Sequence, residues 1–62
     1  MTYIIEELEK GKHSREINSY SSLDKALKDL LILIEAEPGN SYRLWKEEEN
    51  VRQIVEIFKG EN

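Results

Sequence analysis

The stretch Ser22–Glu37, SLDKALKDLLILIEAE, decides the fold of this chain of 62 residues. A serine before its first leucine suits a helix N-cap, and both Ser21 and Ser22 can provide that cap. Pro38 restricts the preceding residue to extended backbone, so the helix should end at or just before Glu37. Apolar residues recur at spacings of three and four, which predicts a helix facing a core; they are Leu23, Ala26, Leu27, Leu30, Leu31, Leu33 and Ile34.

The segment after this helix predicts an antiparallel hairpin. Ser41–Lys46 and Arg52–Lys59 are rich in aromatic and β-branched residues, and the segment Glu47–Val51 connects them. Pro38-Gly39-Asn40 supplies the preceding turn. The second of these strands carries apolar residues on both faces, which predicts a central strand or a strand with one face on a partner; they are Ile54, Val55, Ile57 and Phe58.

The segment before the helix allows two interpretations. Tyr3–Leu8 and Arg15–Tyr20 form a hairpin around Lys10-Gly11-Lys12-His13 in the first, whereas Thr2–Lys10 is a short helix ended by Gly11 in the second. We favour the hairpin, because the second segment shows no helical stripe. The expected fold is therefore a single small α+β domain over residues 1–62, ββαββ, with one helix packed on one face of a four-stranded antiparallel sheet.

Composition narrows the classes of function. The net charge is −4, and the basic residues are interspersed with acids, which argues against direct nucleic-acid binding and favours a protein partner with a basic surface. Cysteine is absent and histidine occurs once, so neither a disulfide framework nor a Cys/His zinc site is expected. The longest apolar run, Leu30–Ile34, is far too short for a membrane span, and the first residues do not resemble a secretory signal. We expect a cytoplasmic protein that does not bind membranes.

No motif in the sequence carries recognisable chemistry. His13 and Ser14 are neighbours in an expected turn, but nucleophilic catalysis also needs an orienting carboxylate and an oxyanion site. The three glycines are isolated and form no phosphate cradle. The acidic run Glu47–Asn50 lacks the alternating ligands and central glycine of a calcium-binding loop. We therefore expect no catalytic residue, cofactor or metal.

Exposed apolar residues point instead to a contact surface. Ile32 falls on the polar side of the helix, and the sheet face away from the helix should expose apolar residues. Trp45 is either a core residue or an interface anchor, and we favour the core because so small a core needs every large side chain. If Trp45, Ile54 and Phe58 pack under the helix, the outer patch consists of Tyr42, Leu44, Val55 and Ile57. The acidic residues of the second hairpin offer a contact for a basic partner. The expected partner-binding residues are Ile32, Tyr42, Leu44, Glu47, Glu48, Glu49, Val55 and Ile57.

The leading hypothesis is a small acidic, non-enzymatic binding protein that acts as an inhibitor or adaptor by masking a macromolecular partner. Phage and mobile elements often encode proteins of this kind, which is an association and not a deduction. One rival is a self-associating structural subunit that forms a homodimer through the same sheet face. A second rival hypothesis is an acidic mimic of nucleic acid. An enzyme is the hypothesis that the sequence favours least. The sequence leaves open the partner, the oligomeric state and the sheet face that meets the helix.

Overall fold

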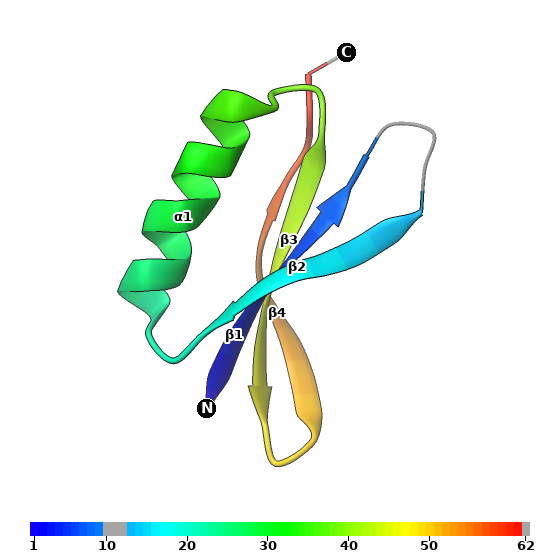
Figure 1. Ribbon diagram of the computed structural model, residues 1–62. Coiled ribbons are helices and arrows are strands. Elements are labelled where there is room, and N and C mark those ends of the chain that lie inside the picture. Colours follow the sequence, from blue (N-terminus) through cyan, green and yellow to red (C-terminus); the bar gives the residue numbers. More distant parts are fainter. Residues whose placement is uncertain (10–12, 62) are drawn as a thin grey trace.

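The computed structural model describes residues 1–9 and 13–61 and contains one four-stranded sheet and one helix (Figure 1). The order is ββαββ, which confirms the predicted α+β fold. The favoured N-terminal hairpin is confirmed, and the alternative helix in this segment is wrong. Most of the predicted turn at residues 10–13 lies outside the described residues. The elements are β1 (Thr2–Leu8), β2 (Ser14–Tyr20), α1 (Leu23–Ala36), β3 (Ser41–Glu48) and β4 (Val51–Phe58).

The strands lie in the order β2-β1-β3-β4. β1 is antiparallel to both β2 and β3, so β2 and β3 run in the same direction on either side of it. α1 connects these two strands and therefore crosses β1. Among the described elements, α1 packs on β1, β2 and β3, and β4 lies beyond the area that the helix covers.

Both ends of α1 lie where the sequence predicts them. Ser22 is the N-cap, and its hydroxyl accepts a hydrogen bond from the Lys25 backbone N–H at 3.5 Å. The helix ends at Ala36, and the Glu37 backbone N–H donates to the Leu33 carbonyl at 2.9 Å. Pro38 then starts the turn into β3, because a proline keeps the residue before it out of the helical conformation.

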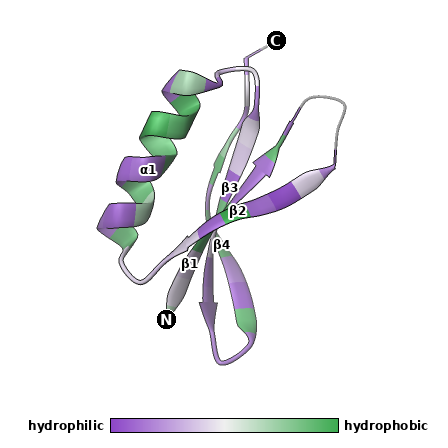
Figure 2. Cartoon of the chain, in the orientation of Figure 1, coloured by the Kyte–Doolittle hydropathy of each residue, from purple (hydrophilic) through white to green (hydrophobic). Residues whose placement is uncertain are grey.

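The core lies between the inner side of α1 and the central strands β1 and β3. Figure 2 shows apolar stretches of α1 alternating with polar ones around the helix. Leu31 is exposed, so its predicted place in the core-facing stripe is wrong. Leu31 lies at the margin of the apolar stripe, on a side of α1 that faces away from the sheet. The buried cluster consists of Ile5, Ala26, Leu30, Tyr42 and Leu44, with Phe58 partly buried against it.

The second hairpin is tighter than predicted. β3 ends at Glu48 and β4 begins at Val51. The turn therefore consists of Glu49 and Asn50, whereas a five-residue connection was predicted. Both turn residues have positive φ, 51° for Glu49 and 65° for Asn50. Positive φ at both central residues is the conformation of a type I′ turn, whose twist matches that of the flanking strands. Glutamate is an unusual residue for this backbone, which is why the sequence did not reveal the turn.

The C-terminal segment closes over the turn that follows α1. The Gly60 backbone N–H donates to Ser41 Oγ at 2.9 Å, and the Glu61 N–H donates to the Pro38 carbonyl at 2.7 Å. A Cβ at position 60 would overlap the backbone of Gly39, so this close approach requires glycine.

Candidate functional site

β4 is an edge strand, so the first of the two interpretations, a central strand, is wrong, whereas the second, a strand with one face on a partner, stays a prediction. It pairs with β3 on one side, and no other strand in the described part of the chain pairs with its outer edge. Its apolar side chains remain exposed, including Val51 at 60%, Ile54 at 45% and Ile57 at 52%. Apolar residues on both faces suggested a buried strand, but here they mark a strand without a covering helix. An uncovered apolar edge is a template for pairing with another chain.

A β-bulge sets the directions of the β4 side chains. Trp45 is opposite Ile54 and Leu44 is opposite Glu56, so Val55 is the additional residue between them. Because opposite residues in an antiparallel pair share a face, Ile54 lies on the helix-free face and Glu56 lies on the helix side. Val55 is itself exposed.

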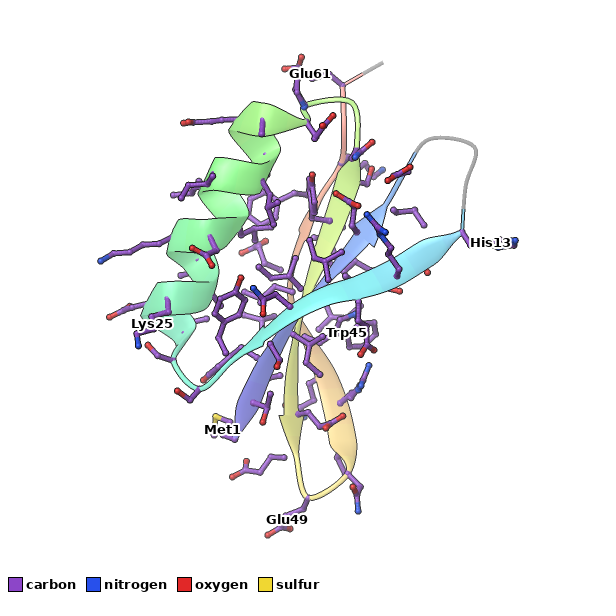
Figure 3. The ribbon with its side chains drawn as sticks, in the orientation of Figure 1. Met1, His13, Lys25, Trp45, Glu49 and Glu61 are labelled. Carbon is purple, nitrogen blue, oxygen red and sulfur yellow. The ribbon has the colours of Figure 1, made fainter. Side chains whose placement is uncertain are left out.

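The predicted outer patch is wrong for Tyr42 and Leu44. Both side chains lie in the core under α1, with exposed fractions of 1% and 0%. Trp45 and Ile54, which were expected under the helix, lie on the opposite face, as Figure 3 shows for Trp45. The expectation for Phe58 is confirmed, because it packs partly buried against the core. Of the predicted patch, Val55 and Ile57 remain exposed on β4.

Polar contacts occupy the helix-free face around Trp45. The indole N–H of Trp45 donates to Glu6 Oε1 at 2.9 Å, and Arg43 Nε lies 2.8 Å from the same oxygen. The Arg43 guanidinium lies 5.9 Å from the centre of the Trp45 ring, within cation–π range. Burial raises the pKa of Glu6, but the hydrogen bonds from Trp45 and Arg43 outweigh it and lower this pKa overall.

Arg52 links the two edges of the sheet across this face. Its guanidinium contacts Glu16 on β2 and lies 2.7 Å from Glu47 on β3. Ile4 on β1 is directly opposite Trp45 and is only 5% exposed, although α1 packs on the other side. Side chains of the protein therefore cover the centre of the helix-free face, and this centre is a poor apolar docking surface.

The acidic residues of the second hairpin do not form one patch. Glu47 lies on the helix-free face and is paired with Arg52. Glu48 is on the other face, and Glu49 is in the turn at the tip, where Figure 3 labels it. Glu48 and Glu49 are exposed, so two of the three predicted acidic contacts are accessible beside the start of β4.

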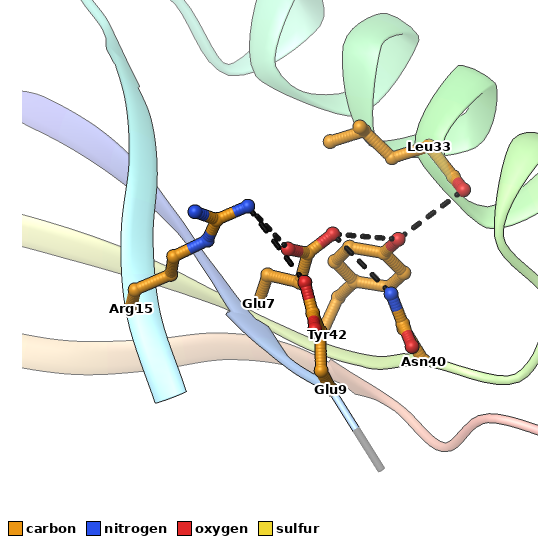
Figure 4. Close-up of polar contacts among 6 residues, drawn as sticks. All are labelled: Glu7, Glu9, Arg15, Leu33, Asn40 and Tyr42. Atoms are coloured by element: carbon orange, nitrogen blue, oxygen red, sulfur yellow. Dashed lines mark hydrogen bonds and ion pairs between the residues drawn. The ribbon is translucent and has the colours of Figure 1, made fainter. Parts of the chain in front are cut away.

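A buried carboxylate at the C-terminal part of β1 was not foreseen from the sequence. Glu7 is 6% exposed and sits under the end of α1 (Figure 4). Its carboxylate accepts hydrogen bonds from the Tyr42 hydroxyl at 3.2 Å, from Asn40 Nδ2 at 3.5 Å and from Arg15 at 3.4 Å. Burial and then the nearby Glu7 charge raise the pKa of Tyr42. Each of these donors comes from a different segment, so the cluster ties β1, β2 and β3 together.

An open groove of about 400 Å³ lies between β2 and α1. Ile32 is on its rim and 63% exposed, which confirms its predicted exposure. Tyr20 lines the groove and donates from its hydroxyl to Asp29 at 2.7 Å. Burial and this hydrogen bond raise the pKa of Tyr20 to about 12. The groove carries few polar groups that are free to orient a ligand.

The described residues do not assemble a recognisable catalytic or metal centre. His13 is exposed at the start of β2, where Figure 3 labels it. Within residues 1–9 and 13–61, no three His, Cys, Asp or Glu side chains are arranged to hold a metal ion. Glu7 accepts hydrogen bonds from Tyr42, Asn40 and Arg15, so its carboxylate is held by donors of its own chain. The β4 edge is therefore the strongest candidate site.

Comparisons with protein-family models, curated proteins and solved structures gave no match for this chain. Over the described residues, α1 is the single helix, and it has neither the length nor the apolar character needed to cross a membrane.

Proposed function

We propose that this chain is a non-enzymatic protein-binding module that acts as an inhibitor or adaptor and masks its partner through β4. The main support for this proposal is that, in the described part of the chain, β4 has an unpaired outer edge and exposed apolar side chains on both faces. An exposed edge strand offers backbone N–H and C=O groups for strand addition, and its side chains provide specificity. β4 has a bulge at Val55 and the charges of Arg52 and Glu56, devices with which native proteins protect an edge, yet Val51, Ile54 and Ile57 remain exposed on it, which favours a binding role.

The charge distribution supports a partner with basic residues near its own strand edge. The net charge is −4, and Glu48 and Glu49 are exposed beside the start of β4. Acids at the rim of an interface mainly speed association and contribute less to affinity. The absence of cysteine fits a reducing compartment, which supports a cytoplasmic protein.

The structure favours protein binding over mimicry of nucleic acid. A mimic needs accessible, regularly spaced acids, whereas Glu6, Glu7, Glu16 and Glu47 are paired with arginines of the same chain. These pairs neutralise much of the sheet surface. The remaining negative charge is scattered over α1 and the hairpin tip, which suits steering better than imitation of a phosphate backbone.

The test uses one variant on β4 and a matched control on α1. Ile57→Glu places a charge on the exposed edge opposite Arg43, a neighbour of opposite sign that helps the variant to fold. Ile32→Glu introduces the same charge at an equally exposed position on the helix. Immobilised wild type and both variants are used to capture partners from the host lysate, and the captured protein is then purified and titrated.

We expect Ile57→Glu to lose the partner and Ile32→Glu to retain it, with all three proteins giving the same circular dichroism spectrum. Equal binding by wild type and Ile57→Glu would remove β4 from the proposal. Loss of binding in Ile32→Glu alone would move the site to the groove between β2 and α1.

A further inference from the structure

We propose that β4 pairs antiparallel with β4 of a second copy of the chain, about a two-fold axis at Ile54. The inference rests on the proposed function, because it concerns the same edge and names an occupant for it. The pairing joins two four-stranded sheets into one continuous sheet with both helices on the same side. Self-pairing then competes with partner binding and keeps the apolar edge covered when the partner is absent.

The side-chain directions of β4 select this register. Residues directly opposite each other must share a face, and Val55 is left out because it is the bulged residue. With Ile54 opposite Ile54 of the second copy, every residue of β4 from Val51 to Phe58 except Val55 has a residue of the second copy opposite it. Val51 then meets Phe58 of the second copy on the helix side, and the two Ile54 side chains meet on the helix-free face. Both contacts cover apolar surface that is exposed in the single chain.

The charges of β4 are compatible with the same register. Arg52 and Glu56 cancel, so β4 is locally neutral although the chain carries −4. Around Ile54, Glu56 is opposite Gln53 of the second copy, and Arg52 is opposite Ile57 of the second copy. No like charges face each other within the paired strands.

The neighbouring register is less favourable. An axis at Glu56 would place its carboxylate opposite that of Glu56 in the second copy, and Arg52 opposite Lys59 of the second copy. Both pairs carry like charges, which are destabilising when directly opposite. This register would also leave Val51 without a strand residue of the second copy opposite it.

The helix leaves room for the second copy. α1 packs on β1, β2 and β3, so it does not overhang β4. The contact is one strand wide, and interfaces of that size are weak. We expect a dissociation constant of roughly 10 μM to 1 mM, within the range of small, transient contacts.

The first test is a charge swap at the two-fold axis. Sedimentation of purified wild type over a concentration series should show a shift from monomer to dimer. Ile54→Glu and Ile54→Lys each place like charges on the axis, so each should remain monomeric, and an equimolar mixture should restore a dimer. Wild type that stays monomeric up to 1 mM, or variants that dimerise as well as wild type, would overturn the proposal.

The second test determines the register by disulfide formation. The chain has no native cysteine, so each introduced cysteine can pair only with its counterpart in the second copy. Directly opposite Cα atoms in antiparallel strands are about 4.5–5.5 Å apart, within the range that a disulfide spans. Ile54→Cys should therefore oxidise to a covalent dimer. Ile57→Cys is the matched control, because this residue is on the same strand and face but about five residues from its counterpart, or roughly 15 Å. We expect at least tenfold less dimer for Ile57→Cys in the same redox buffer.

Equal oxidation of both cysteine variants, or oxidation of Ile57→Cys alone, would overturn the register. The cysteine readout also keeps the proposal testable should the charged variants fail to fold. The two proposals fail separately: sedimentation of the pure protein tests self-pairing, whereas partner capture by Ile57→Glu tests the function. A monomeric wild type that still loses its partner in Ile57→Glu would retain the function and reject the dimer.

Discussion

Replacing Tyr42 by phenylalanine removes one oxygen atom from the core and leaves the ring in place. The Tyr42 hydroxyl lies 3.2 Å from Glu7 Oε2 and 3.3 Å from the Leu33 carbonyl, so it connects the buried carboxylate with the end of α1. A hydrogen bond to a charged group contributes about 1.5–3 kcal/mol, and a buried acceptor left without its donor costs a similar amount. Asn40 and Arg15 still donate to Glu7 in the variant, which limits the loss to about 1–3 kcal/mol.

This loss is large for a chain of 62 residues, whose free energy of unfolding is expected to be about 3–9 kcal/mol. Urea unfolding followed by circular dichroism and by Trp45 fluorescence measures it, because Trp45 is the single tryptophan. The midpoint should fall while the slope m stays constant. Tyr3→Phe is the control, since the Tyr3 hydroxyl donates to Met1 Sδ in an exposed position, and we expect its effect to stay below about 0.5 kcal/mol.

A double-mutant cycle with Glu7→Gln isolates the pair. The two substitutions should be non-additive by about 0.5–3 kcal/mol, because they remove the same interaction. A Tyr42→Phe variant as stable as Tyr3→Phe, or strict additivity with Glu7→Gln, would refute the assignment of the hydroxyl as a support for the buried carboxylate.

Two further predictions concern the turn and the alkaline range. Substituting Glu49→Asn together with Asn50→Gly should raise the free energy of unfolding by about 0.5–1 kcal/mol, because both positions have positive φ; a thermal melt unchanged or lowered would contradict this. The pKa of Tyr20 is about 12 in the fold against the ordinary tyrosine value of 10.0, so the unfolded chain loses this proton first. Its contribution to stability is therefore complete below pH 10 and declines between pH 10 and 12. Urea midpoints at pH 9 and pH 11 should differ less in Tyr20→Phe than in wild type, and equal differences would count against the hydrogen bond to Asp29.

The architecture was accessible from the sequence because each element carries its own local signal. The leucine spacing with Ser22 and Pro38 gives both ends of α1, and the β-branched segments give the strands. These signals depend on residues close together in the chain. The order of the strands and the burial of each residue depend on residues far apart in the chain. The interpretation of β4 as a central strand was wrong for this reason.

The choice of sheet face illustrates the limit. Alternation in β3 separates Tyr42 and Leu44 from Arg43 and Trp45, but it does not say which set meets the helix. The size of Trp45 suggested that it was in the core. The better signal was the pair of residues that share its face. Arg43 and Glu47 lie on the same side of the strand as Trp45, and their charges are costly to bury under a helix.

The exposed state of β4 follows from an arrangement that no single segment encodes. α1 is long enough to cover part of the sheet only, and the order β2-β1-β3-β4 places β4 outside that part. Apolar residues on both faces indicate a buried strand and an unprotected edge equally well. The Glu7 cluster was hidden for the same reason, since Asn40 and Tyr42 lie 33 and 35 residues from Glu7 in the sequence.

The crossing of α1 over β1 also determines how the chain reaches its fold. Each hairpin closes a short loop, but a two-stranded hairpin alone is marginal in water. The central pair of β1 and β3 joins Leu8 to Ser41, so forming it closes a loop that contains β2 and the whole helix, at a cost in chain entropy. Contacts of such long sequence separation slow folding relative to a helical bundle of equal length. We therefore expect docking of the two hairpins to limit the folding rate, in the single cooperative step that is usual for a domain of this size.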